Sequence, residues 1–160
     1  MKIVLALVLA TSVAHAEPYD YTIDPAPLYS KETSIELVAG TWGAASVYAY
    51  FAWFRHASRT TAPIFTLEGF GVNTYAGGAD KLGHFWAGHM FSYVTTEALV
   101  HGGFRTLPSS IVAFGLSQLF GTISEYKDSL HYQFEYGDII ANASGAVFNI
   151  LLENWPALDG

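Results

Sequence analysis

Residues 35–54, IELVAGTWGAASVYAYFAWF, contain a single charged residue, Glu36, and no proline. Small side chains gather in the first half of this stretch, and Ser34 stands before it as a candidate cap. The pattern predicts a long helix that lets a neighbouring helix come close. The stretch also has the length of a membrane span, and Arg55 and Arg59 follow its end, as in a positive-inside topology.

Three further apolar stretches, residues 82–100, 109–124 and 138–153, are separated by glycine-rich turns. No strand-like alternation persists and no internal repeat is present, so we expect an all-α protein, a compact bundle of about four helices. The three stretches carry Asp, Lys, His, Glu or Asn in or near their apolar runs. A membrane would tolerate these residues only if they faced the bundle interior, and the sequence leaves membrane insertion open.

The N-terminus has the anatomy of an export signal: Lys2, an apolar run, and small residues at 14 and 16. We expect a signal peptide over residues 1–16, cleaved after Ala16, an extended arm over 17–33 and a single helical domain over 34–160. An uncleaved anchor is the alternative, but the apolar run is shorter than the roughly 20 residues of a span. The predicted location is the cell envelope, exported and periplasmic, with membrane association open.

Composition narrows the classes of partner. The formal net charge of −7 argues against nucleic acid and anionic headgroups as main partners. The chain contains no cysteine, so it has neither a disulfide nor the cysteine that carries the lipid of a lipoprotein. Because 51% of the residues are apolar and only 13% are charged, we expect contact with a membrane or another envelope component. Composition does not identify a protein partner.

One candidate site opens the second helix, where Asp80 and His84 stand four residues apart and therefore share a helix face. A carboxylate beside an imidazole fixes the ring tautomer and makes its other nitrogen a base or a metal ligand. Lys81, one residue further round, is expected to pair with an acid from another helix. Asp80, Lys81 and His84 are the catalytic candidates. The alternative is that Asp80 caps the helix and that His84 is a core histidine whose ring nitrogens are hydrogen-bonded.

Two further motifs extend the polar set. Glu125 and Asp128 lie one turn apart at the end of the third helix, and Asp138 and Asn142 share a face of the fourth, where Gly145 allows close helix approach. Two carboxylates close together can bind a divalent metal ion. The alternatives are that Glu125 and Asp128 form a charged helix end in water, and that the fourth helix is simply capped and packed through its small residues. The candidate metal ligands are Asp80, His84, Glu125 and Asp128.

In this order the motifs resemble the YfiM-like family of predicted periplasmic lipoproteins, a domain of unknown function. A looser similarity, to the first and last motifs of VanZ-like membrane proteins, favours a compact bundle close to a membrane. The resemblance implies a small helical envelope protein but no reaction, and the absence of cysteine departs from the lipoprotein label. The residues that match the family's polar positions are Asp80, Lys81, His84, Glu125, Asp128, Asp138 and Asn142.

We expect the first of three functions and keep the other two as alternatives. The first is a structural or accessory envelope protein whose buried polar network fixes the helices. The second is a metal-assisted hydrolase or transferase acting on an envelope lipid or cell-wall component, with His84 as base, Asp80 orienting it, and Glu125, Asp128 or Asp138 holding a cation or acting as acid. The third is a membrane-associated binding protein that uses the aromatic residues, which include Trp42, Trp53, Trp86 and Trp155. Sequence alone does not decide whether the protein is an enzyme.

Overall fold

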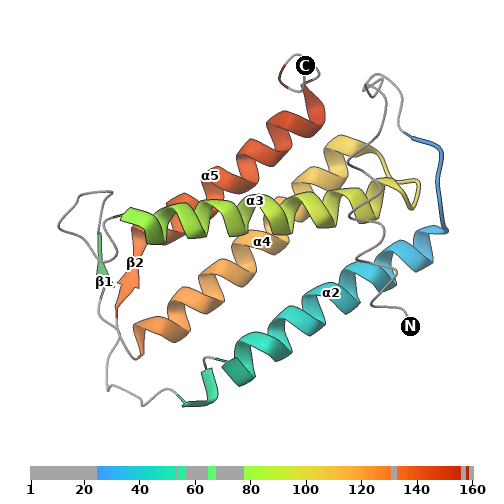
Figure 1. The fold of residues 1–160 in the computed structure, drawn as a ribbon. Helices are drawn as coiled ribbons and strands as arrows, with labels where there is room; N and C mark the ends of the chain where they lie inside the picture. Colours follow the sequence, from blue (N-terminus) through green and yellow to red (C-terminus); the bar gives the residue numbers. More distant parts are fainter. Residues whose placement is uncertain are drawn as a thin grey trace.

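The computed structural model describes residues 25–52, 54–56, 65–67, 78–130, 133–155 and 158. Four helices make up most of this part of the chain, as Figure 1 shows: α2 (Lys31–Ala52), α3 (Ala79–Val100), α4 (Thr106–Ser129) and α5 (Tyr136–Asn154). The all-α prediction with about four helices is confirmed. The expected signal peptide and residues 17–24 of the arm lie outside the described residues.

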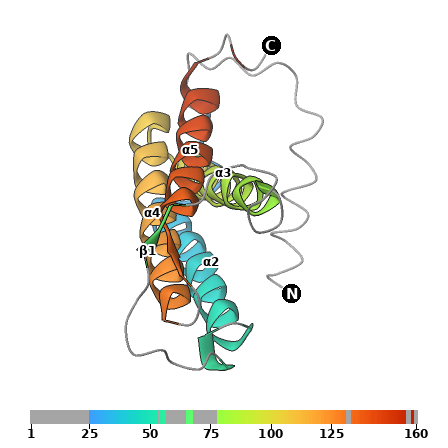
Figure 2. The same ribbon diagram turned by 90° about the vertical axis from the view of Figure 1, so that its left-hand side faces the viewer.

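Consecutive helices run in opposite directions, so α3 and α5 begin at the end of the bundle where α2 and α4 finish (Figure 1). Helices α3, α4 and α5 pack against one another, and the contact between α3 and α5 is the most extensive. Helix α2 packs mainly on α3. Viewed from the side, α3 crosses α4 and α5 at a marked angle (Figure 2). The arrangement gathers residues from the starts of α3 and α5 and the end of α4.

Two glycines set the distance between α3 and α5. A Cβ atom on Gly145 would lie 1.9 Å from the carbonyl oxygen of Phe85, and one on Gly88 would lie 2.1 Å from the carbonyl oxygen of Asn142. These separations are far shorter than any van der Waals contact, so the two helices meet backbone to backbone. The close approach predicted at Gly145 is therefore present, and Gly88 makes the matching contact from α3.

Trp42 attaches α2 to the other helices. Its ring centroid lies 5.1 Å from that of Phe91 on α3 and 5.5 Å from that of Phe120 on α4. The indole Nε1–H donates a 3.1 Å hydrogen bond to the Thr95 hydroxyl. The ring thus joins three helices and also has its one polar group satisfied.

Three helix starts differ from the sequence prediction. Helix α2 begins at Lys31, and Ser34 lies inside it, buried against Gly102, instead of capping it. Helix α4 begins at Thr106. Pro108 therefore lies in the first turn, where its missing N–H group costs no hydrogen bond within the helix. Helix α5 begins at Tyr136 after an extended Glu135, so Asp138 is in the first turn and not at the cap.

Two strands of two residues, β1 (Phe65–Thr66) and β2 (Phe134–Glu135), pair in parallel with Phe65 opposite Phe134. Their length is too short to produce an alternating pattern, which explains why the sequence did not predict them. A short 3-10 helix, η2 (Phe54–His56), follows α2. The strand pair holds residues 65–67 beside the start of α5, where β2 leads directly into the helix (Figure 1).

The described helices bury polar residues and expose apolar ones. The largest side chains that are almost completely buried are those of Lys81, Asn149, Thr96, Ser34, Ser92, Ser110 and Ser129. Hydrogen bonds join these residues across helices: the Asn149 amide donates to Thr96, and the Asn154 amide to Ser110. The outer faces carry large apolar side chains, such as Leu82, Ile111, Leu119, Ile140 and Val147.

The backbone contact between α3 and α5 yields a stability prediction. Gly145→Ala should destabilise the fold by about 1–3 kcal/mol, because the added methyl group forces the helices apart. Gly115→Ala on α4 is the matched control, since its Cβ meets nothing within 4 Å; it should leave stability unchanged or raise it by up to about 1 kcal/mol. Thermal unfolding of the purified protein checks both. Equal midpoints for the two variants would contradict the contact.

Candidate functional site

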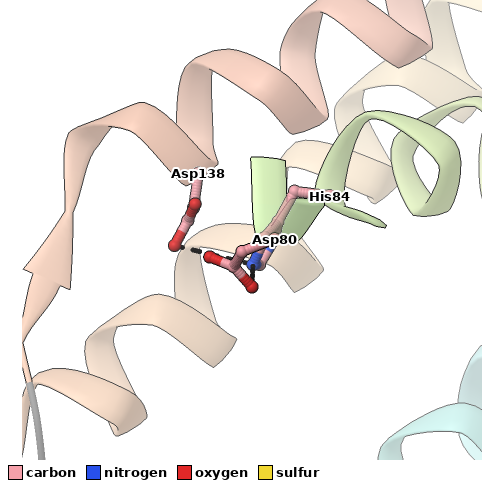
Figure 3. Close-up of side chains that lie close together, drawn as sticks. All are labelled: Asp80, His84 and Asp138. Carbon is pink, nitrogen blue, oxygen red and sulfur yellow. Dashed lines mark ion pairs between the residues drawn. The ribbon is translucent and has the colours of Figure 1, made fainter. Parts of the chain in front are cut away.

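A cluster of charged residues lies at the end of the bundle where α3 and α5 begin and α4 ends. Three elements besides α3 contribute: α4, β2 and α5. Figure 3 shows Asp80, His84 and Asp138 turned toward one another from the first turns of α3 and α5. Among the described residues, close contacts join Asp80, Lys81, His84, Glu125, Glu135, Asp138 and Asn142 into this cluster.

Lys81 is the centre of the first half of the cluster, and its side chain is only 2% exposed. Its Nζ lies 3.2 Å from Asp80 Oδ2 and 2.6 Å from Asp138 Oδ1, and it donates a hydrogen bond to Glu135 Oε2. Three carboxylates thus surround one buried ammonium group. Such direct, short contacts are what a buried cation needs to offset its desolvation. The prediction that Lys81 pairs with an acid from another helix is confirmed by Asp138.

His84 is the centre of the second half, and its contacts are different. Its Nε2 lies 3.5 Å from Asp138 Oδ2 and 3.8 Å from both Asp80 Oδ1 and Glu125 Oε1. These separations exceed those of normal N–H···O hydrogen bonds, which cluster near 2.9 Å. Three carboxylate oxygens therefore surround Nε2 without closing on it. The side chains of His84 and Asp80 are 28% and 31% exposed, so this half of the cluster is open at one side.

Asn142 holds the opposite edge of the imidazole ring, with its amide Nδ2 3.2 Å from His84 Nδ1. An amide side chain presents either its NH₂ or its carbonyl to a ring nitrogen, so Asn142 accepts either tautomer. In the structure the amide NH₂ faces Nδ1 and donates to it, which places the ring proton on Nε2, toward the three carboxylates. Nε2 acts as a ligand or a base when the Asn142 amide is turned round, so that its carbonyl accepts from Nδ1–H.

The cluster has more acidic than basic groups. Burial, together with the nearby Asp138 and Asp128, raises the pKa of Glu125 to about 8, so this carboxyl group holds its proton at neutral pH. Four carboxylates, those of Asp80, Glu125, Glu135 and Asp138, face a single lysine and a histidine. Glu125 and Asp138 have side chains that are only 3% and 7% exposed, so water screens them little. Buried carboxylates in excess require either protons or a cation. Asp80, His84 and Asp138 each offer one ligand atom to such a cation, and these atoms all lie within 4.8 Å of one another.

Most site residues predicted from the sequence come together here. One predicted residue lies outside the site, one predicted role is wrong, and one residue was not predicted. Asp128 is half-buried on the next turn of α4 and does not join the three carboxylates nearest His84 Nε2. The alternative role of Asp80 as an N-cap is wrong, because Gly78 occupies that position with a φ of 84°. Glu135 was missed; its only signal in the sequence is an acid placed between two aromatic residues just before Gly137.

The buried half of the cluster, centred on Lys81, yields a stability prediction. Lys81→Met should cost about 3–5 kcal/mol of stability, because it leaves buried carboxylates without their counter-ion. Lys127→Met, at an exposed position on α4, is the control and should change stability by less than about 0.5 kcal/mol. Denaturant unfolding of the two variants measures the difference. If Lys81→Met were as stable as the control, Lys81 would not hold the helices together.

Comparison with families of known proteins gives one match. Residues 68–154 match the model of a family described as predicted periplasmic lipoprotein (DUF2279), and this range includes every residue of the cluster. Comparison with curated proteins and with solved structures gives no match. The family description is consistent with an exported protein of the cell envelope. The match covers more than half of the sequence, so the chain belongs to this family of predicted periplasmic lipoproteins.

Proposed function

We propose that the cluster is a divalent-cation site and that the protein is a metal-dependent hydrolase or transferase acting at a membrane of the cell envelope. The observation that carries this proposal is the open arrangement around His84 Nε2, with carboxylate oxygens from three helices at 3.5–3.8 Å. A network that only fixed the helices would instead close into direct hydrogen bonds, as Lys81 does.

The spacing fits a bound ion. A tetrahedral ion with bonds of about 2.0–2.2 Å keeps its ligand atoms roughly 3.3–3.6 Å apart. The distance from His84 Nε2 to Asp138 Oδ2 is 3.5 Å, and that to Asp80 Oδ1 is 3.8 Å. One imidazole with carboxylates suits Zn²⁺ or Mn²⁺ better than a soft metal, which prefers thiolates. Asp80, His84 and Asp138 would be the ligands, with small adjustments of their side chains.

The same residues would leave one coordination position of the ion open for a reaction. Asp80 and His84 are partly exposed, so a cation held between them keeps a position open to water or substrate. Glu125 lies beyond the ligand set, 3.8 Å from His84 Nε2, where a carboxyl group is placed to exchange a proton. The cation would supply charge to polarise a phosphoryl or carbonyl oxygen, and Lys81 would hold Asp80 and Asp138 in position.

The distribution of polar and apolar residues supports a location within a membrane. Most buried residues in the described part of the chain are Ser, Thr, Asn, Ala or charged, with Leu99, Val100 and Phe134 as the larger apolar ones, while many large aliphatic side chains face outward. Water would favour the reverse arrangement, whereas lipid favours small and polar residues between helices. Among the described helices, α4 is the one that has the length and hydropathy of a membrane span. An interior that contains Lys81 and Asp138 is tolerated because these residues neutralise each other.

Charged and aromatic residues lie where a membrane would place them. No Asp, Glu, Lys or Arg occurs in residues 37–52, 85–96, 106–124 or 139–152, so the formal charges of the four helices stay near the helix ends. Exposed Tyr and Trp side chains also lie near helix ends, where bilayer interfaces favour them. They include Tyr48, Tyr50, Tyr126, Tyr136 and Trp155. This pattern supports the membrane contact expected from composition.

Metal content tests the proposed centre. The full-length protein, purified in mild detergent and dialysed against Zn²⁺ or Mn²⁺, should retain about one ion per chain, because three ligands from two helices converge. His84→Ala and Asp138→Asn should lose the ion while keeping a cooperative unfolding transition. His101→Ala is the matched control: His101 also lies near a carboxylate, Glu97 at 3.2 Å, but at the other end of α3.

Retention of the ion by His84→Ala, or its loss from His101→Ala alone, would contradict the proposed site. A wild type that binds no ion, together with variants that unfold at much lower temperature, would favour the structural role instead.

Membrane fractionation tests the location. The wild type should stay with membranes after an alkaline wash and need detergent for release. Leu119→Lys, on the outer face of α4 near its middle, should reduce the amount in membranes, since a charge at that depth costs about 2.5–3.5 kcal/mol. Leu107→Lys, exposed in the first turn of α4, should have a smaller effect. A wild type recovered folded in the wash without detergent would exclude membrane insertion.

A further inference from the structure

A groove follows the seam between α3 and α5 on the outer surface of the bundle. Its first part is a hollow of about 230 Å³ that includes Lys81, Leu82, Gly137 and Ile140 in its lining. Its second part is a hollow of about 460 Å³ that extends to Val147, Phe148 and Leu151. Phe85, Ile140 and Ser144 line both parts, so the two adjoin and form one shallow groove along α5.

The groove has one polar end and an apolar body. It begins beside Lys81, whose Nζ contacts the Asp80 and Asp138 carboxylates of the cluster. Apart from Lys81 and Ser144, its side chains are apolar. From Gly137 to Leu151 the groove extends about 21 Å at the helical rise of 1.5 Å per residue. One leaflet of a bilayer contributes about half of the 30 Å hydrocarbon core, so the groove is long enough for a whole acyl chain.

We propose that this groove binds one acyl chain of a membrane phospholipid and places its phosphate headgroup at the charged cluster. The inference rests on the proposed metal-dependent function and names its substrate class. The phosphate would be bound by the cation, because Lys81 is already surrounded by three carboxylates. Binding of the chain would thereby place the phosphoester at the Lys81 end of the groove, on the side of the charged cluster.

The lining favours an acyl chain over an extended peptide. A peptide backbone brings N–H and C=O groups that need hydrogen-bond partners, whereas a hydrocarbon chain needs none. Apart from Lys81 and Ser144, the groove offers only apolar side chains. The groove is also continuous with the apolar outer faces of α3 and α5, where Leu82, Ile140 and Val147 are 63%, 60% and 43% exposed. In a membrane these faces are bathed in phospholipid chains.

Photo-crosslinking tests the proposal directly. The full-length protein in bilayer discs is illuminated with a phosphatidylglycerol that carries a diazirine in one acyl chain, and the labelled peptides are identified by mass spectrometry. Label should concentrate on residues 82–86 and 140–151. Ser144→Trp, which fills the groove at the position shared by both hollows, should lower labelling of these peptides at least fivefold, and Val147→Trp should lower it as well.

Leu119→Trp is the matched control, because it adds the same ring to an exposed position on α4 outside the groove; it should leave labelling of the groove unchanged. Thermal midpoints and metal content are recorded for all variants. Labelling that is spread evenly over α3, α4 and α5, or that persists in both groove variants, would overturn the proposal. Labelling of the groove by a polyprenyl phosphate probe but not by phosphatidylglycerol would overturn it too.

The experiment separates this inference from the proposed function. A protein that retains its metal ion but shows no labelling of the groove keeps the metal centre and loses the lipid site. A protein that labels the groove but binds no ion keeps the lipid site and loses the metal-dependent function.

Discussion

The backbone contact between α3 and α5 is the constraint on which the rest of the structure depends. Gly145 and Gly88 allow each helix to lie against a carbonyl group of the other. Because the contact is so close, Asp138 in the first turn of α5 reaches both Lys81 and His84 in the first turns of α3. The same approach leaves a shallow groove along the seam, lined by Phe85 and Ile140. The charged cluster and the groove are thus two consequences of one packing arrangement.

Within the cluster, structure and chemistry divide between two residues. Lys81 is buried, and its direct contacts with carboxylates from α3, β2 and α5 join these elements. His84 is partly exposed, and the carboxylates around its Nε2 stay beyond hydrogen-bond distance. A polar network that served stability alone would give both residues closed contacts. The division explains how one cluster can hold helices together and still keep an open centre with more acidic than basic groups.

Much of this arrangement was predictable because local spacing determines it. Residues four apart share a helix face, which placed Asp80 with His84 and Asp138 with Asn142, and small residues near Gly145 indicated close packing. What the sequence did not predict depends on contacts between distant segments. Glu135 directly precedes α5 and reaches Lys81, 54 residues earlier in the chain, across the packing of α3 and α5.

The boundaries of α2 and the orientation of the helices illustrate the same limit. Ser34 is enclosed in α2 because Gly102, at the end of α3, leaves room for it. The sequence also did not predict the polar interior. Every helix mixes apolar with small polar residues around its whole circumference, so periodicity does not indicate which face is buried. The spacing of residues thus indicates which polar side chains share a helix face, but it does not indicate which helices pack together.

The proposed centre requires His84 Nε2 to bind the metal ion together with Asp80 and Asp138. X-ray absorption spectroscopy of the Zn²⁺-loaded protein in detergent measures this coordination. We expect nitrogen and oxygen ligands at about 2.0–2.2 Å, with the outer-shell scattering of one imidazole, which His84→Ala removes. A spectrum of zinc with oxygen ligands only, or an imidazole signal that survives His84→Ala, would contradict the account.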